Sequence, residues 1–288
     1  MAEPLSHDRA DDSVLPATRW TAVLVTPVLV VAGLMLTLFP GDTERMWAWP
    51  ITPDLTALAV GGGYLGGALF FVRAAVSRRW SPLDVSFLAA TALTVPLLVA
   101  TLLHWDRFSH WHVSFGAWLL LYVVTPVLLP LLWVRNRRTR PRDAPPGPEV
   151  PAGLRAAVAA GGAGHLAVAA TMFLRPSLVI GRWPWEVTPL TARTLAGFIA
   201  FVGVVYLAFL WERRWPALRL HVESVTVGIL LVAVAALRAW GDLDGPVWSV
   251  ALFAVLLVGT LAGLVALQLR MRHAAAPTEV RAEVRPGR

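Results

Sequence analysis

The chain has 288 residues, of which 57% are hydrophobic and only 15% are charged, and its mean hydropathy is +0.62. Since a soluble domain carries about 25% charged residues, this composition excludes an ordinary soluble fold. The sequence contains no cysteine and no lysine, which excludes disulfides, thiolate metal sites, Schiff-base lysines and P-loop phosphate binding.

Eight apolar runs of about 20 residues follow one another along the chain, the length that a helix needs to cross a hydrocarbon core about 30 Å thick. In lipid each segment must satisfy its own backbone hydrogen bonds, so helices are expected. The runs do not alternate as the strands of a membrane barrel do. The predicted fold is therefore all-α, a polytopic membrane helix bundle. We place the spans at 20–39, 54–74, 84–103, 113–134, 152–174, 191–211, 219–239 and 246–269.

Three polar segments flank these spans. Residues 1–19 are polar and acidic and lack the basic start of a cleaved signal peptide, so the first span is expected to stay in place. Residues 136–151 hold four arginines and five prolines and are interpreted as a solvated linker. Residues 273–288 are rich in alanine, proline and charge, and are predicted to be a disordered tail.

The distribution of arginine predicts the orientation in the membrane. Most of the 25 basic residues lie in the N-terminal segment, the linker, the tail and the loops on the same side. Because positively charged loops stay in the cytoplasm, we expect a multipass protein of the cell (inner) membrane with both termini cytoplasmic. The same placement explains the net charge of +7, so no nucleic acid is expected as a partner. The expected partners are membrane lipid and a protein that binds the linker.

The chain contains an internal duplication. Residues 36–57 recur as residues 172–193 at an offset of 136, and after one deletion the match continues at an offset of 135. The two repeats are assigned to residues 20–135 and 152–272, with four spans each. An even number of spans makes both repeats enter the membrane in the same direction, so we predict parallel repeats with a pseudo-twofold axis along the membrane normal. The later matches include Arg78, Arg79 and Trp80, which return as Arg213, Arg214 and Trp215.

The sharpest motif is a W-x-W-x-[IV]-T-P element before the second span of each repeat. Its copies are Trp47-Ala-Trp49-Pro-Ile-Thr52-Pro53 and Trp183-Pro-Trp185-Glu-Val-Thr188-Pro189. Threonine before proline suits a helix start, because the threonine can cap free N–H groups and the proline needs no donor at the first helical position. The tryptophans are expected to anchor the loop at the membrane interface, within two aromatic belts. Alternatively, both copies line an extracellular vestibule whose helix N-termini hold an anion.

One loop, between the third and fourth spans, concentrates residues that can bind a metal: His104, Asp106, His110 and His112. Imidazole and carboxylate suit zinc, copper or iron, although the spacing matches no H-E-x-x-H signature. The aligned positions of the second repeat hold Ala239, Gly241, Gly245 and Val247. The loop is therefore interpreted either as a metal or haem site private to the first repeat, or as a pH-sensitive or merely interfacial loop.

Ionisable residues inside spans would mark a transport or proton path, and they are scarce. His165 lies about halfway along the fifth span, and Glu223 lies near the cytoplasmic end of the seventh. His165 is interpreted first as a histidine used in packing. The lack of a carboxylate in the middle of a span weakens the hypothesis of a proton-coupled transporter.

The second span contains a glycine-rich run at residues 61–67. The pairs Gly62/Gly66 and Gly63/Gly67 have the spacing that allows close helix contact in lipid. Tight helix packing is the first interpretation, and a permeation path that uses glycine carbonyls is the alternative.

The string Trp183-Pro-Trp185-Glu-Val-Thr188-Pro189-Leu190-Thr191-Ala192 resembles a recurring phrase in an uncharacterised family of tryptophan-rich multipass membrane proteins of high-GC bacteria. The resemblance covers this loop and the span after it, and extends weakly to the other repeat. It implies a location in the membrane and no particular chemistry or cofactor.

Three functions remain open at this point. The first is an accessory or sensory membrane protein that binds a partner through its loops or linker. The second is a small-molecule transporter or permease with a pathway at the repeat interface, and the third is a metal- or haem-binding protein that uses the loop at 104–112. An enzyme is less favoured, because no Ser/His/Asp or paired-carboxylate arrangement stands out. A polar cavity between the repeats would favour transport, whereas a bundle sealed by glycine contacts would favour the accessory role.

Overall fold

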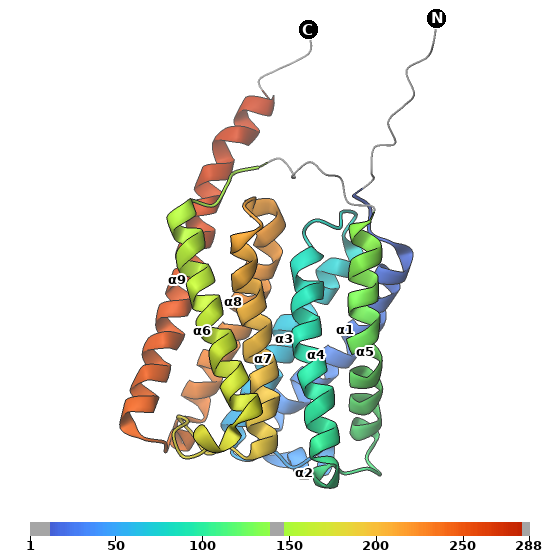
Figure 1. Cartoon of the computed structure of the whole chain (residues 1–288), viewed down its shortest axis with the longest axis vertical. Helices are drawn as coiled ribbons and strands as arrows, with labels where there is room; N and C mark the ends of the chain where they lie inside the picture. The colour runs from blue at the N-terminus through green and yellow to red at the C-terminus, as the bar shows by residue number, and fades with distance from the viewer. Residues whose placement is uncertain (1–11, 139–146, 284–288) are drawn as a thin grey trace, which may run out of the picture.

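The computed structural model describes residues 12–138 and 147–283, and this part of the chain is a bundle of α-helices with no strand (Figure 1). Eight helices are long and apolar enough to cross a membrane, which confirms the predicted fold class. A ninth, α2 (Thr43–Met46), is a short helix in a loop. The eight long helices are α1 (Pro16–Leu38), α3 (Asp54–Val76), α4 (Asp84–Leu103), α5 (Val113–Arg137), α6 (Ala152–Leu174), α7 (Pro189–Leu207), α8 (Trp215–Arg238) and α9 (Val247–Glu283).

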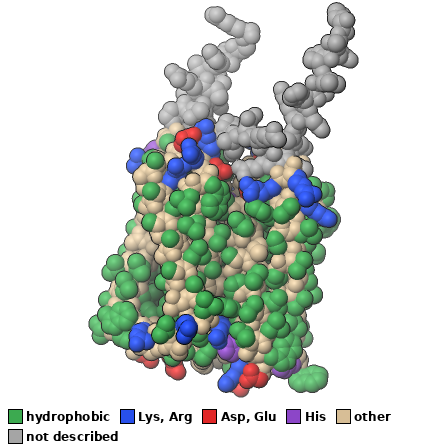
Figure 2. Space-filling model, in the orientation of Figure 1, with side chains coloured by type: hydrophobic (Ala, Val, Ile, Leu, Met, Phe, Trp, Pro, Cys, Tyr) green, Lys and Arg blue, Asp and Glu red, His purple; other side chains and the backbone are tan. Residues whose placement is uncertain are grey.

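The spans are apolar, and several of the threonine hydroxyl groups that they contain bond to the backbone of their own helix. Thr26, Thr101 and Thr226 each donate from Oγ1 to the carbonyl four residues earlier, at 2.7 Å. This back-bonding lets threonine lie inside a membrane helix, because the hydroxyl then needs no water as a partner. The surface of the bundle is apolar over the same stretch. Figure 2 shows one face, on which an apolar band separates two ends that carry arginines.

Helix pairing links the two halves of the chain, α1–α5 and α6–α9. Within the halves, α1 packs on α3 as α6 packs on α7, and α4 packs on α5 as α8 packs on α9. Between the halves, α3 packs on α8 and α4 packs on α7. The second long helix of each half therefore contacts the third long helix of the other. Figure 1 shows α1 and α5 toward one side of the bundle and α6 and α9 toward the other.

One contact lies where the axis relating the halves must pass. Ser86 on α4 and His221 on α8 occupy equivalent positions of the duplication, at an offset of 135. Their side chains meet, with Ser86 Oγ 2.5 Å from His221 Nδ1, and both residues are fully buried. A residue can touch its own repeat equivalent only close to the axis that relates the two copies. The helices α4 and α8 thus border this axis.

The bundle has two distinguishable ends. The linker end holds the starts of α1 and α6 and the end of α5, and the α2 end lies opposite (Figure 1). At the linker end, the segment before each half's first helix pairs with the recurring Arg-Arg-Trp loop. Trp80 N donates to Asp12 O at 2.8 Å, and Trp215 N donates to Pro148 O at 3.0 Å. The duplicated Arg-Arg-Trp sequence therefore reflects a duplicated backbone contact.

Tryptophan positions correct the prediction that nearly all of them form interfacial belts. Trp20, Trp111 and Trp248 are exposed, as that prediction requires. Trp47, Trp49, Trp80, Trp185 and Trp215 are instead buried within the protein. Hydropathy places a residue near the end of a span but does not say whether its side chain faces lipid or the other helices. These five tryptophans are thus core residues of the protein.

The helix α9 runs past the predicted start of the tail. It continues to Glu283, beyond the position of His273 where the sequence predicted disorder. The rest of the predicted tail, most of the N-terminal segment and residues 139–146 of the predicted linker lie outside the described residues.

Candidate functional site

The histidine loop between α4 and α5 supplies helix caps. His112 is the N-cap of α5, and its Nδ1 lies 2.7 Å from Ser114 Oγ and accepts from Ser114 N at 3.4 Å. Its Nε2 lies 2.7 Å from the carbonyl oxygen of Arg45. A carbonyl can only accept, so Nε2 carries the proton and both ring nitrogens are engaged. This histidine ties the loop to the segment that follows α1.

His104 ends α4 and faces the second half of the chain. Its Nε2 lies 2.7 Å from Nη1 of Arg193, whose Nε donates to Phe173 O at 3.1 Å. Partial burial lowers the pKa of His104, and the positive charge of Arg193 lowers it further. The neutral ring is thereby favoured, and it accepts a hydrogen bond from the guanidinium. His104 therefore joins α4 to the start of α7.

The remaining two residues of the predicted metal site point elsewhere. The His110 ring packs on Trp105, with centroids 5.0 Å apart, and Asp106 is exposed beside Arg107. Across residues 12–138 and 147–274, no group of three or more histidine, cysteine, aspartate or glutamate side chains is placed to hold a metal. The structure thus does not bring His104, Asp106, His110 and His112 together. The residue types suggested a metal site, but the cap at His112, the bond of His104 to Arg193 and the packing of His110 on Trp105 engage the three rings separately.

The W-x-W motif begins a helix as predicted in the second half only. Thr188 is the N-cap of α7, its Oγ1 accepts from Thr191 N at 3.2 Å, and Pro189 is the first helical residue. In the first half, α3 begins at Asp54, with Pro53 at the cap position and no side-chain cap. The prediction for Thr52 and Pro53 is therefore wrong.

The start of α3 is capped from the other half of the chain. The backbone N–H of Leu55 donates to Oδ2 of Asp242 at 2.8 Å, across 187 residues of sequence. A carboxylate is favoured here by the free N–H groups and by the positive end of the helix dipole. The alternative interpretation placed a bound anion at this helix N-terminus, and a carboxylate of the same protein lies there.

This cross-half cap gives a first prediction. We expect Asp242→Ala to lower the free energy of unfolding by about 1–2 kcal/mol, the usual cost of losing a cap and a dipole partner. Thr52→Ala is the matched control, because Thr52 precedes the same helix without capping it, and it should change stability little. Thermal unfolding of the two variants measures the difference. Equal losses would contradict the assignment of Asp242 as the cap.

The tryptophans of the motif fill the α2 end of the bundle. Trp49 is 3% exposed, and its ring centroid lies 4.7 Å from that of Trp118 and 5.2 Å from that of Phe108, both edge to face. In the second half, Trp185 donates from Nε1 to Oγ1 of Thr56 on α3 at 2.9 Å. These side chains form a packed aromatic core, and they do not support a vestibule lined by tryptophan.

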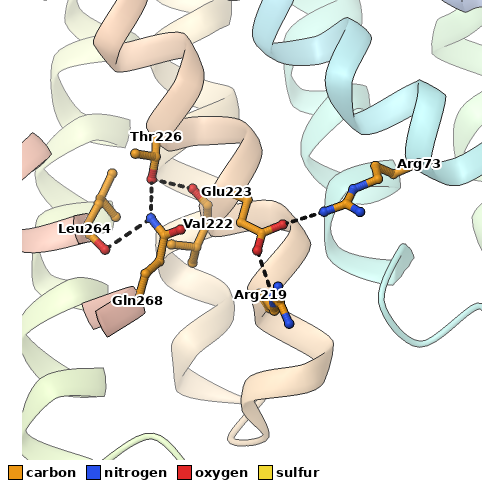
Figure 3. Close-up of polar contacts among 7 residues, drawn as sticks. All are labelled: Arg73, Arg219, Val222, Glu223, Thr226, Leu264 and Gln268. Atoms are coloured by element: carbon orange, nitrogen blue, oxygen red, sulfur yellow. Dashed lines mark hydrogen bonds and ion pairs between the residues drawn. The ribbon is translucent and has the colours of Figure 1, made fainter. Parts of the chain in front are cut away.

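The two predicted intramembrane polar residues both have partners. His165 Nδ1 lies 2.8 Å from Gly161 O, and its ring packs edge to face on Tyr206 at 5.4 Å. Glu223 receives Arg73 Nη2 at 2.9 Å and Arg219 Nε at 2.7 Å, as Figure 3 shows. His165 therefore has the packing role expected first, and Glu223 belongs to an ion-pair network at the linker end.

A cleft at the linker end was not predicted from the sequence. Its volume is about 260 Å³, and it lies beside α4, α5 and the turn after α7. The carboxylate of Asp84 is buried in its wall, with Oδ2 3.7 Å from Nε of Arg137, and that guanidinium lies 4.6 Å from the ring of Trp133. The lining residues are Asp84, Val85, Leu88, Trp133, Arg137 and Trp211. From the sequence, each of these residues is placed near the end of a span, and no pattern predicts that they lie together.

The fold and these contacts define a multipass α-helical membrane protein. Comparison of the chain with models of protein families, with curated protein sequences and with solved structures gives no match. The assignment of a function therefore rests on the geometry of the bundle.

Proposed function

We propose that the protein is an accessory or sensory component of the cell membrane whose two halves form a sealed bundle, with no substrate pathway between them. The observation that carries this proposal is the glycine contact between α3 and α8. A Cβ atom added at Gly66 would lie 3.0 Å from Cα of Gly228 and 3.0 Å from the carbonyl oxygen of Ser224. The two backbones are therefore in direct contact, which leaves no space for water between them.

A second set of contacts joins α3 to α7, in addition to the seam that α3 forms with α8. A Cβ atom at Gly63 would lie 2.6 Å from the ring of Phe198 on α7, and that ring packs edge to face on Tyr64 at 5.6 Å. The hydroxyl of Tyr64 lies 2.8 Å from the hydroxyl of Tyr122, and both residues are buried. These two hydroxyl groups thus satisfy one another, whereas a transport pathway would present them to a substrate.

The alternative is a small-molecule transporter or permease. It is favoured by the duplicated architecture, because parallel repeats about an axis along the membrane normal occur in transporters. The buried Ser86–His221 pair beside the axis is the polar contact that such a pathway would have to open. We favour the sealed bundle, because the glycine contacts join backbone to backbone and cannot part by side-chain motion alone.

Cysteine labelling tests the sealed seam. The chain has no cysteine, so a single substitution reports on one position. We expect Thr94→Cys and Ser224→Cys, at residues that are 6% and 4% exposed, to resist a membrane-impermeant thiol reagent applied from either side. Mass spectrometry of the intact protein measures the labelling. Reaction at either position in the folded protein would contradict the proposal, and reaction from both sides would favour the transporter.

Exposed positions at the two ends serve as controls and also test the orientation. We propose that the linker end is cytoplasmic, because it carries most of the arginines. Trp111→Cys, at the fully exposed indole of the α2 end, should then react in intact cells. Arg78→Cys, at the linker end, should react only after permeabilisation. The reverse pattern would invert the orientation and leave the result for the seam unaffected.

A further inference from the structure

The ion pairs of Glu223 join the two halves of the chain at the linker end. Oε2 of Glu223 accepts from Nη2 of Arg73 on α3 at 2.9 Å, and its Oε1 accepts from Nε of Arg219, one turn earlier on α8, at 2.7 Å (Figure 3). Both distances are those of charge-assisted hydrogen bonds. One carboxylate therefore holds two guanidinium groups close together, one from each half.

This arrangement leaves one positive charge uncompensated. Within the described residues, the ion pairs of Arg73 and Arg219 both end on Glu223, and the other nitrogen atoms of the two side chains make no further hydrogen bond. The side chains of both arginines are 52% exposed, whereas that of Glu223 is 15% exposed. A guanidinium group has five N–H donors, so the two arginines keep accessible donors for a further anion.

The depth of the two arginines gives the class of anion. Arg73 lies in the last turn of α3, and Arg219 lies near the start of α8. With a rise of about 1.5 Å per residue, both lie where a spanning helix leaves the hydrocarbon and meets the headgroups of phospholipids. Guanidinium groups match the geometry of phosphate oxygens. The nearest abundant anion for this site is therefore a lipid phosphate.

An apolar stripe continues from the arginines toward the middle of the membrane. Leu230 and Val234 follow Glu223 on the same face of α8, because residues three, four or seven positions apart lie one above the other along a helix. They are 47% and 50% exposed. Leu230 lies about 10 Å from Glu223 along the helix axis. A phosphate bound at the arginines would thus be followed by an apolar track that an acyl chain can cover.

We propose that Arg73 and Arg219 bind the phosphate of an anionic phospholipid, and that the bound lipid bridges the two halves of the chain. The phosphate accepts hydrogen bonds from both guanidinium groups, while Glu223 keeps these groups in place. An acyl chain lies along Leu230 and Val234. The lipid therefore adds a second link between α3 and α8, beside the one that Glu223 makes.

The charge of the site distinguishes anionic from zwitterionic lipids. A glycerol headgroup leaves the lipid with the net negative charge that the uncompensated positive charge attracts. A choline headgroup brings its own cation, which the same positive charge repels. In the orientation proposed above, this end also faces the cytoplasmic leaflet, whose negative surface attracts arginine. We therefore expect preference for phosphatidylglycerol over phosphatidylcholine.

Native mass spectrometry of the purified full-length protein tests this preference. The probe is an equimolar mixture of phosphatidylglycerol and phosphatidylcholine with identical acyl chains, added to delipidated protein. Arg73→Gln and Arg219→Gln should each weaken binding of the glycerol lipid about tenfold, as expected for the loss of a hydrogen bond between charged groups. Arg78→Gln is the matched control, because it removes the same charge from an exposed arginine at the same end. It should leave the preference intact.

Thermal unfolding gives a second measurement, because a ligand that binds only the folded protein raises its unfolding temperature. Phosphatidylglycerol should stabilise the parent protein and Arg78→Gln more than it stabilises Arg73→Gln or Arg219→Gln. An excess of inorganic phosphate should not displace the lipid, since free phosphate has no acyl chain to lie along α8. The two arginines are changed singly, so the test stands if only one of these variants folds.

Three outcomes would overturn the proposal. The first is equal retention of the two lipids by the parent protein. The second is an equal loss of binding in Arg78→Gln, which would show a general attraction to a basic surface. The third is displacement of the lipid by inorganic phosphate, which would show a site for a free anion. The labelling of the seam at Thr94 and Ser224 does not depend on any of these outcomes.

Discussion

Gly66→Leu should lower the free energy of unfolding by about 3 kcal/mol, the upper part of the range for overpacking a tight contact. The nearest atoms to an added Cβ are the Cα and N of Gly228 and the carbonyl oxygen of Ser224. All three belong to the backbone of α8, so no side chain can turn away to make room. The whole helix must shift, which breaks the contact between the two halves of the chain.

Gly263→Leu is the matched control for this substitution. Gly263 lies inside α9, and an added Cβ would meet no atom within 4 Å. The two variants gain the same helix propensity, because leucine is favoured over glycine by a similar amount at both positions. Thermal unfolding in detergent, followed by circular dichroism, compares them. In Gly66→Leu, a cysteine at Ser224 should also become reactive. Equal stability of the two variants would refute close packing of α3 on α8.

Trp49→Ala should destabilise the protein by about 3–5 kcal/mol, the cost of truncating a fully packed aromatic side chain. The indole of Trp49 is buried against Trp118 and Phe108 at the α2 end of the bundle. Lipid is as apolar as this core, so the loss comes from missing van der Waals contacts and the cavity left behind. The substitution should therefore loosen the packing of the loop before α3.

Trp111→Ala provides the comparison, because Trp111 lies in another loop at the same end and is fully exposed. We expect it to change the unfolding free energy by less than about 0.5 kcal/mol, as surface substitutions usually do. It should instead weaken anchoring at the membrane interface. If both alanine variants unfold at the same temperature as the parent, Trp49 is not a core residue and the aromatic-belt interpretation returns.

The candidate sites show which contacts can be predicted from the sequence. The cap at Thr188 and Pro189 was predictable, because a cap bonds to the backbone two or three residues away. The cap on α3 was not, because Asp242 comes from the other half of the chain. Thr52 precedes a proline just as Thr188 does, so the sequence predicts a cap at both. Only the tertiary structure shows that the carboxylate of Asp242 caps α3 in place of Thr52.

Sequence by itself determined the class of this protein. Eight apolar runs of membrane-spanning length fix the number of helices, because lipid forces each segment to satisfy its own backbone. The recurrence at offsets of 136 and 135 showed the duplication, and the alternation of apolar runs with arginine-rich segments predicted which ends of the helices lie together.

Tertiary structure alone decided which residues meet. Helix periodicity gives the face of a residue on its own helix, but the identity of the facing helix depends on how the bundle packs. The exchange of partners, α3 with α8 and α4 with α7, brings Glu223 to Arg73 and places α4 beside α8, where Ser86 meets His221. It also encloses the cleft at Asp84. The same packing seals the seam at Gly66, because small residues let two backbones approach only where the opposite helix is equally free of side chains.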